Sequence, residues 1–554
     1  MSFGFQGLQP CVAAGRAQIL QSSQVMPHRN LCFALLAVLA ASANGAADVF
    51  VAPSSAKAWR QTAADRSRRI IFNNDGNDPI TKIRRPSVED MLAARTTPLA
   101  GTQVDAIFYC TFSAGFGNFS HLTKVGQVHT SRADIFAHNQ MPAFLAAGID
   151  PLRVMVDFAH QHRMECFWSM RMNDTHDGGK SGQGPVLFEN NKLKREHPEL
   201  LLGRRDQPLK HGSWSAVNYA RDEIRELAFR YVEEVCRDYD IDGIELDFFR
   251  HPVFFSSTGR GEPATDSERR QMTDLMRRIR TMADAAGRAR ARPILIAMRV
   301  PDSVEYSRAI GLDLERWLAD DLLDLIVVSG YLQLNDWDYS VALAHRFGVK
   351  VYPSLDESRV KDEAAVARRM TDAAYRGRAA NVWAAGADGI YLFNQFNPHR
   401  PLWRELGDPA TLTKLDKDYF ASIRGVGSAA GGNLPHQSIQ TIETLNPTAP
   451  RSIPPGASAS ARLRIGEDFG ATGPVSLRLR LLFNRPAAAL PLTVSVDGVT
   501  LTVVRPPQDW LEFAPEASAV HRGFNEVTVR LDPAGCPPLN WLDLMLEGRH
   551  PAPH

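Results

Sequence analysis

Between residues 68 and 397, short runs of β-branched and aromatic residues alternate with longer segments of helical periodicity. Strands that alternate with helices imply right-handed βαβ units and a parallel sheet. Eight such units predict a closed (β/α)8 TIM barrel, of the α/β fold class. The eight predicted strands are residues 69–73, 104–112, 164–170, 241–247, 293–299, 323–328, 349–353 and 388–394.

The pattern changes after the eighth strand. A last helical stretch ends near Ile423, and residues 425–436 are rich in glycine, alanine and serine, which is typical of a flexible linker. Beyond the linker, apolar and polar residues alternate with a period of two, as in the run 477–481. We therefore predict a barrel over residues 65–424 and a C-terminal antiparallel β-sandwich over residues 437–554. We expect this sandwich to be an accessory domain, detachable and without chemistry of its own.

The first 47 residues (1–47) are typical of an export leader. We expect translation to start at Met26, where a short basic segment precedes an apolar run over residues 31–41 and then a series of small residues. This order is that of a secretory signal peptide, and the apolar run is shorter than the roughly 20 residues that span a bilayer. We therefore expect a secreted or periplasmic protein without stable membrane insertion.

Composition and motifs exclude several kinds of partner. The net charge of +1 provides no global basic field that would attract nucleic acid. The six cysteines follow no metal-binding spacing, and the sequence contains no nucleotide-binding or zinc-hydrolase motif. Residues 73–78 are rich in Asn and Asp but lack the closing glutamate of a calcium loop, so we interpret them as a polar turn. We expect no cofactor, no metal and no nucleic-acid partner.

The strongest candidate chemistry lies in the predicted strand 241–247, IDGIELD. Because side chains alternate along a strand, Glu245 and Asp247 share one face, and the other face is apolar. The apolar face of a barrel strand packs on helices, so both acids should point inward, with Asp247 at the rim of the active-site face. Two inward acids are costly unless they are paired or solvated. We expect Asp247 to be catalytic, and Glu245 to be either catalytic or paired with an inward arginine such as Arg299.

The surrounding stretch, DYDIDGIELDFFRHP, resembles the fourth strand of a family-10-like group of secreted bacterial glycoside-hydrolase-like barrels. It also resembles the DGxDxDxE motif of family-18 chitinases, with Asp242, Glu245 and Asp247 at the first three acidic positions. The fourth position, which is the proton donor in chitinases, is Phe249 here. The resemblance covers residues 65–400 and implies a glycoside-hydrolase barrel, but the chitinase mechanism does not carry over.

Glycoside hydrolysis normally uses two carboxyl groups, one to protonate the leaving oxygen and one to attack or to activate water. The partner of Asp247 must therefore lie at the end of another strand. Asp356 and Glu357 follow the seventh strand and are the preferred candidates, and Asp174 follows the third strand. Each of them is alternatively an acid of a turn or helix cap.

Carbohydrate binding requires aromatic rings for sugar faces and polar side chains for hydroxyl groups. The connection over residues 171–220 is unusually long and leaves the catalytic side of the barrel, which favours a role in binding. Three arginines at the mouth would suit an anionic sugar. The candidate binding residues are Trp168, Arg171, Asn173, His176, Arg250, His251, Arg299, Tyr331, Asn394 and Gln395.

These observations favour a secreted glycoside hydrolase that cleaves a poly- or oligosaccharide with a carboxylate pair at the C-terminal face of the barrel. Two alternatives stay open, because a fold alone does not decide function. The absence of an acid at Phe249 favours a non-catalytic carbohydrate-binding or cell-surface barrel. The third alternative is a polysaccharide lyase with Tyr331 or His176 as its base.

Overall fold

A computed structural model of the chain describes residues 56–551, except for 113, 425–438, 472–474, 487–490, 506–508 and 533–536. The expected signal peptide and the whole of the expected linker lie outside the described residues. Within the described part of the chain, no helix combines the length and the apolar character needed to cross a bilayer.

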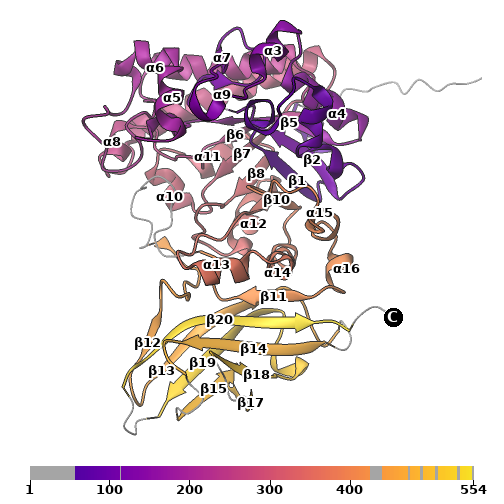
Figure 1. The fold of residues 1–554 in the computed structure, drawn as a ribbon, viewed down its shortest axis with the longest axis vertical. Helices are drawn as coiled ribbons and strands as arrows, with labels where there is room; N and C mark the ends of the chain where they lie inside the picture. The colour runs from indigo at the N-terminus through magenta and orange to yellow at the C-terminus, as the bar shows by residue number, and fades with distance from the viewer. Residues whose placement is uncertain are drawn as a thin grey trace, which may run out of the picture. The chain divides into compact units, whose positions relative to one another are not determined.

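Eight parallel strands close into a barrel, which confirms the predicted fold class (Figure 1). Around the barrel the strands follow the order β1-β10-β9-β8-β7-β6-β5-β2, so each strand lies beside the next barrel strand of the sequence. The carboxyl ends of all eight strands therefore meet at one mouth. The strands are β1 (Ile70–Asn74), β2 (Val104–Tyr109), β5 (Glu165–Arg171), β6 (Gly243–Asp247), β7 (Leu295–Val300), β8 (Leu325–Val328), β9 (Lys350–Leu355) and β10 (Ile390–Leu392).

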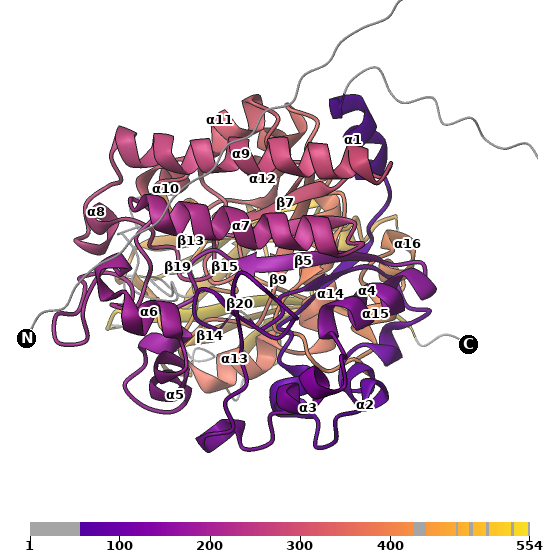
Figure 2. The same cartoon turned by 90° about the horizontal axis from the view of Figure 1, so that it is seen from above.

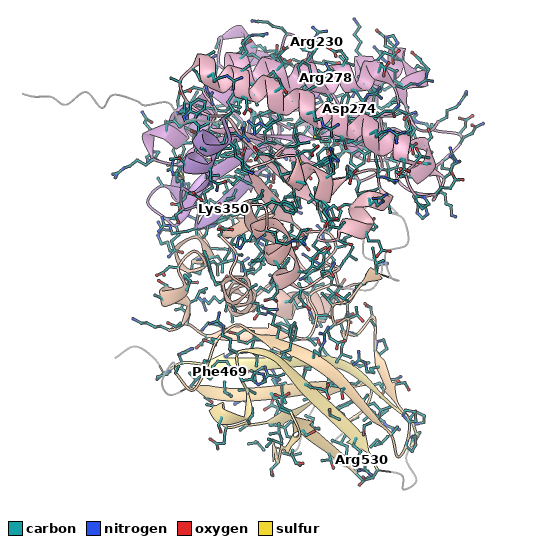
Figure 3. The ribbon with its side chains drawn as sticks, turned by 180° about the vertical axis from the view of Figure 1, so that it is seen from behind. Arg230, Asp274, Arg278, Lys350, Phe469 and Arg530 are labelled. Carbon is teal, nitrogen blue, oxygen red and sulfur yellow. The ribbon has the colours of Figure 1, made fainter. Side chains whose placement is uncertain are left out.

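Amphipathic helices cover the outside of the barrel. The longest, α9 (Asp266–Ala289), begins with a capping box at Thr265 and packs against α7 (Asp222–Asp238) (Figure 2). Exposed residues such as Asp274 and Arg278 mark its outer face, while its apolar face is buried (Figure 3). The other helices are α1 (Ala56–Ala64), α2 (Val88–Ala93), α3 (Met141–Ala146), α4 (Pro151–Gln161), α5 (Gln183–Glu189), α6 (Lys192–Glu196), α8 (Ser256–Gly259), α10 (Val304–Ala309), α11 (Leu314–Ala319), α12 (Trp337–His345), α13 (Glu363–Arg369), α14 (Asp372–Ala384), α15 (Leu402–Glu405) and α16 (Pro409–Leu412).

The position of β6 in the barrel determines where its acidic side chains point. The Glu245 carboxylate accepts a hydrogen bond from Tyr391 Oη of β10, at a distance of 3.1 Å. Strand β10 lies four places away from β6 around the barrel, so this contact crosses the interior. Glu245 therefore points inward, as its alternation with apolar residues predicts, and Asp247 lies on the same face of the strand.

Two antiparallel sheets form the predicted β-sandwich. Alternate residues of β14 are buried, including Leu477, Leu479 and Leu481, and they share a core with Val527 and Val529 of β19 in the other sheet. One sheet contains β11 (Lys417–Phe420), β20 (Leu539–Arg549), β14 (Ser476–Phe483), β18 (Trp510–Phe513) and β17 (Val503–Arg505), with β12 (Arg451–Ile453) paired to β20. The other contains β13 (Ser458–Ile465), β19 (Gly523–Leu531), β15 (Leu492–Val496) and β16 (Val499–Thr500), and a small separate sheet pairs β3 (Asn118–Phe119) with β4 (Gln127–Val128).

Strand β11 joins the barrel to the sandwich. The sequence pattern predicts helix here, but residues 417–420 form a strand that pairs with β20. Helix α14 packs on this strand so closely that a Cβ atom at Gly377 would lie 2.3 Å from the carbonyl oxygen of Asp418. The sandwich sheet therefore includes a strand from the segment that the sequence assigns to the barrel, and whether the sandwich is detachable stays a prediction.

Candidate active site

Asp247 ends β6, and both of its carboxylate oxygens accept hydrogen bonds. Oδ1 accepts from the backbone N–H groups of Phe249 at 2.9 Å and Arg250 at 3.0 Å. Oδ2 lies 3.3 Å from Nη1 of Arg299, its register partner on β7. These donors orient a nearly buried carboxylate at the rim of the barrel, where the active sites of such barrels lie.

Glu245 lies one layer deeper and is fully buried. Its Oε2 accepts hydrogen bonds from Ser169 and Tyr391, whereas Oε1 has no hydrogen-bond partner among the described residues. Burial, and next the negative charge of Asp247, raise the pKa of Glu245 to about 7. Glu245 thus retains a proton over much of the range in which an ordinary glutamate is ionised.

Tyr331 links Asp247 to a second carboxyl group. The guanidinium group of Arg299, which pairs with Asp247, lies 5.5 Å from the centroid of the Tyr331 ring. On the same ring, the guanidinium group of Arg359 lies 4.7 Å from the centroid. Arg359 Nη2 is 2.8 Å from Oε1 of Glu357, whose side chain is 42% exposed. A continuous series of contacts therefore runs from Asp247 through Arg299, Tyr331 and Arg359 to Glu357.

Asp356, the neighbour of Glu357, is engaged in ion pairs. It is fully buried, and it pairs with Arg424 and, at 3.6 Å, with Arg359. Arg424 also donates a hydrogen bond to the carbonyl oxygen of Glu357. Asp356 therefore holds the end of β9 in place, and Glu357 is the more accessible acid of the predicted pair.

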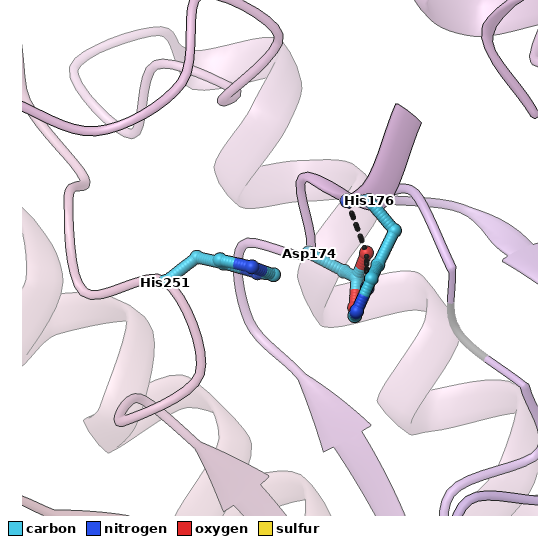
Figure 4. Close-up of side chains that lie close together, drawn as sticks. All are labelled: Asp174, His176 and His251. Carbon is cyan, nitrogen blue, oxygen red and sulfur yellow. Dashed lines mark hydrogen bonds and ion pairs between the residues drawn. The ribbon is translucent and has the colours of Figure 1, made fainter. Parts of the chain in front are cut away.

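Asp174 forms a buried network with His176 in the connection between β5 and α7 (Figure 4). His176 Nδ1 lies 2.8 Å from both oxygens of Asp174, and the amide of Gly115 donates to Oδ1 at 2.8 Å. Burial opposes ionisation, but His176 and Arg171 hold the pKa of Asp174 well below its ordinary value. Both oxygens of Asp174 are therefore engaged within the protein, and Asp174 orients the ring of His176.

Arg250 determines the tautomer of His176. A guanidinium group has no acceptor, so the 2.6 Å contact between Arg250 Nη2 and His176 Nε2 makes Nε2 the acceptor. The proton of the ring then lies on Nδ1, toward Asp174. His251 lies beside His176, with 5.0 Å between the ring centroids. Burial, and next the charge of Arg250, keep the pKa of His251 well below its ordinary value, so this ring is neutral.

Asp174, His176 and His251 have potential ligand atoms within 4.8 Å of one another, a spacing that fits a metal ion. Their surroundings do not suit a cation. Arg171 lies 3.2 Å from Oδ2 of Asp174, and Arg250 contacts His176. Two guanidinium groups would repel a metal ion at this distance and occupy the lone pairs that it needs. These residues therefore fit a hydrogen-bonded network better than a metal centre.

Two predicted binding residues lie away from the mouth. Trp168 is in register with Ile244 on the helix-facing side of the barrel, and its Nε1 donates to Thr111. The amide group of Asn173 exchanges hydrogen bonds with the backbone of Val217 at 2.9 and 3.0 Å. Asn173 therefore ties the long connection to the end of β5 and has no free group for a sugar.

Asn394 and Gln395, the two predicted binding residues after β10, have different surroundings. Gln395 is buried and contacts Tyr375 and Arg400. Asn394 lies at the mouth, where its Nδ2 is 3.4 Å from Oε1 of Glu357. Of the two, Asn394 is therefore placed to contact a substrate.

Sequence reasoning missed three residues of the site: Asp75, Arg359 and Tyr391. Asp75 was interpreted as part of a polar turn, but it pairs with Arg171, which is held between Asp75 and Asp174 and is therefore not available to a ligand. The parity of the eighth strand would have placed Tyr391 inside the barrel. The nearness of Arg359 to Glu357 in the sequence was the only signal for that arginine.

A cavity of about 450 Å³ adjoins this network. It lies between the long β5–α7 connection and the segment after β6, and Thr175, Gly178, Ser213 and His251 contribute to its wall. A Cβ atom at Gly178 would lie 1.9 Å from Ser213 Oγ, so an alanine there would require the Ser213 side chain to change its rotamer. The cavity has the size of a small-molecule site, and residues of the long β5–α7 connection form most of its wall.

No known protein family matches the chain, and no curated protein sequence matches it significantly. Solved structures with a similar fold include a cycloisomaltooligosaccharide glucanotransferase from a Paenibacillus species, at 10% identity and a TM-score of 0.34, with 86% of this chain and 57% of that chain covered. A family-36 α-galactosidase from Geobacillus stearothermophilus has 12% identity and a TM-score of 0.37, with 84% and 56% covered. A family-18 N-acetylglucosaminidase from Paenibacillus barengoltzii has 12% identity and a TM-score of 0.33, with 62% and 98% covered. The chain thus spans little more than half the length of the first two proteins, and these likenesses concern the fold alone.

Proposed function

We propose that the protein is a glycoside hydrolase in which Asp247 and Glu357 are the two reacting carboxyl groups. The chain of contacts from Asp247 through Tyr331 to Glu357 carries this proposal. It joins two acids from the ends of different barrel strands at the C-terminal mouth, and glycoside hydrolysis uses two carboxyl groups on either side of the scissile bond.

The surroundings of the acids suggest different roles. Asp247 is oriented by three N–H donors, which suits attack on the anomeric carbon or activation of a water molecule. Glu357 is the exposed acid, which suits proton transfer to the leaving oxygen. Glu245 is a positioning residue: when it is protonated, Asp247 carries the only negative charge of the pair.

The test replaces each acid by its amide and measures hydrolysis of aryl glycosides and polysaccharides. Asp247→Asn should lower turnover by about 10²–10⁴-fold or more on all substrates. Glu357→Gln should do so on polysaccharides but much less on aryl glycosides whose leaving group needs no proton. Glu363→Gln, an exposed acid at the start of α13, is the matched control. Near-normal turnover in Asp247→Asn would refute the assignment.

One observation favours a second candidate, a polysaccharide lyase. Asp174 orients His176 through Nδ1, and Nε2, whose lone pair accepts a hydrogen bond from Arg250, becomes a base for a carbon-bound proton only when Arg250 turns to the substrate. Arg250 beside it could neutralise the carboxylate of a uronate. A lyase releases an unsaturated product with ultraviolet absorbance, whereas a hydrolase releases a saturated reducing end, so the product separates the two reactions.

We also propose that the protein is exported, on the basis of the basic, apolar and small-residue order after Met26. Expression of the full chain, followed by cell fractionation and sequencing of the mature N-terminus, tests this. Cleavage near residue 47 supports export, and an intact leader in the cytoplasmic fraction contradicts it.

A further inference from the structure

Three guanidinium groups surround the ring of Tyr331. Those of Arg250, Arg299 and Arg359 lie 4.8, 5.5 and 4.7 Å from its centroid. We call these four residues the Tyr331 cluster. Its close packing depends on Gly330, where a Cβ atom would lie 2.5 Å from Arg299 Nη2. The sequence and fold thus concentrate positive charge at the mouth of the barrel.

The Tyr331 cluster contains several buried polar atoms that have no hydrogen-bond partner among the described residues. Among the described residues, no partner exists for Tyr331 Oη, Arg250 Nε or Arg359 Nε, although each of these atoms is buried. Tyr331 itself is only 3% exposed. Unpaired buried donors are costly, and at a functional site their partner is often a ligand. All three atoms can donate, so the ligand group that satisfies them must be rich in acceptors.

Among the described residues, Arg250 is the member of the cluster that forms no direct ion pair. Arg299 pairs with Asp247 and Arg359 pairs with Glu357. Within the described part of the chain, Arg250 forms no ion pair, and its closest polar side-chain contact is Nε2 of His176, which accepts a hydrogen bond and supplies no negative charge. A half-buried guanidinium group that lacks a carboxylate partner is a binding site for an anion.

We propose that the substrate carries an anionic group on its sugar, a carboxylate or a sulfate, which binds Arg250 and the free donors of Tyr331 and Arg359. This inference rests on the proposed function for the identity of the ligand as a carbohydrate. Arg299 contributes through its charge, because it is fully buried, pairs with Asp247 and lies 3.9 Å from the centroid of the Phe393 ring. Arg171, which the sequence also suggested, is not part of this site because Asp75 and Asp174 hold it.

The test measures binding to the full chain by calorimetry, with glucuronate, glucose 6-sulfate and glucose as probes. At least one anionic probe should bind more tightly than glucose, and the comparison between the two anions distinguishes carboxylate from sulfate. Arg250→Gln should weaken anion binding by about 10- to 100-fold and weaken glucose binding much less, because it removes a charge-assisted hydrogen bond that only the anion makes. Arg346→Gln, an exposed arginine paired with Glu315, is the matched control and should change neither.

Equal binding of all three probes, or an equal loss for charged and neutral probes in Arg250→Gln, would overturn the inference. Its failure is distinguishable from that of the proposed function. If neutral aryl glycosides are hydrolysed and Arg250→Gln leaves anion binding unchanged, the hydrolase survives and the inference does not. If anions bind in an Arg250-dependent manner but Asp247→Asn does not lower turnover, the proposed site fails and the anion site remains.

Discussion

A buried ion pair across the boundary between barrel and sandwich should be one of the most sensitive points of the fold. Arg369 at the end of α13 and Asp543 on β20 are both fully buried. Arg369 Nη2 lies 2.6 Å from Oδ1 of Asp543, and Nη1 lies 2.9 Å from Oδ2. Replacement of Asp543 by alanine removes both hydrogen bonds and leaves a buried guanidinium group without a counter-charge.

These contacts determine how much stability Asp543→Ala should lose. Arg369 would keep only carbonyl partners, such as that of Ser422 at 2.8 Å. Loss of one partner of a buried ion pair typically costs about 3–5 kcal/mol. Asp338→Ala is the matched control, because Asp338 of α12 pairs with Arg464 of β13 across the same boundary but is 55% exposed. We expect this exposed pair to contribute less than about 1 kcal/mol.

The free energy of unfolding of both variants is measured by urea titration, with tryptophan fluorescence as the signal. Trp541 provides a local reporter, since its Nε1 donates to the carbonyl oxygen of Asp543 at 3.0 Å. The double variant Arg369→Met/Asp543→Leu should recover most of the lost stability, because an apolar pair of similar volume needs no counter-charge. A chain that ends before the linker should fail to fold, since it exposes β11 and Arg369. The reasoning is refuted if Asp543→Ala costs no more than Asp338→Ala, or if the shortened chain folds.

Two further predictions concern the barrel mouth. Burial raises the pKa of Glu245 from 4.5 to about 7 in the folded protein. The resulting stability is fully present below pH 4.5, the pKa in the unfolded chain, and is lost as the pH rises through about 7. Glu245→Gln should reduce this decline by about 3 kcal/mol in urea titrations at a series of pH values, and an unchanged pH dependence would contradict the assignment. Gly330→Ala should cost more than about 2 kcal/mol and lower turnover, because Gly330 has φ of +133° and no space for Cβ. Gly523→Ala, at φ of +114° with open space around it, is the control for backbone strain, and an equal cost in both variants would show that the packing on Arg299 does not matter.

The barrel could be predicted because its signal is local and repeated. Each strand is a short apolar run between helical segments, and the inward side of β6 follows from the alternation of Glu245 and Asp247 with apolar residues. Strand ends were less accurate: the predicted strand 388–394 is only Ile390–Leu392 in the structure. Strand β11 could not be predicted, because four residues carry no clear periodicity and their partner strand, β20, is more than a hundred residues away.

The site was predictable to the extent that residues at strand ends share one mouth. That rule brought Asp247, Glu357 and Tyr331 together as candidates, and the structure places them in one chain of contacts. This rule could not reveal which polar groups already form hydrogen bonds or ion pairs within the protein. Arg171 is occupied by carboxylates from the ends of two strands, and Asn173 is occupied by the backbone of its own connection. Such pairings depend on side-chain geometry that a strand-end rule does not contain.

The sandwich also contributes to the position of the candidate acid Glu357, which explains why the two parts of the chain are packed together. Asn446, in the sandwich segment, donates hydrogen bonds of 3.2 Å to the carbonyl oxygen of Arg424 and to the hydroxyl group of Ser422. Arg424 in turn donates to the carbonyl oxygen of Glu357 and pairs with Asp356. The backbone that carries Glu357 is therefore held by Arg424, which lies 67 residues later in the sequence, and Arg424 is in turn held by Asn446 of the sandwich. A second domain that supports the loop of Glu357 cannot be exchanged freely, because any shift of Asn446 would be transmitted through two hydrogen-bonded steps to this acid.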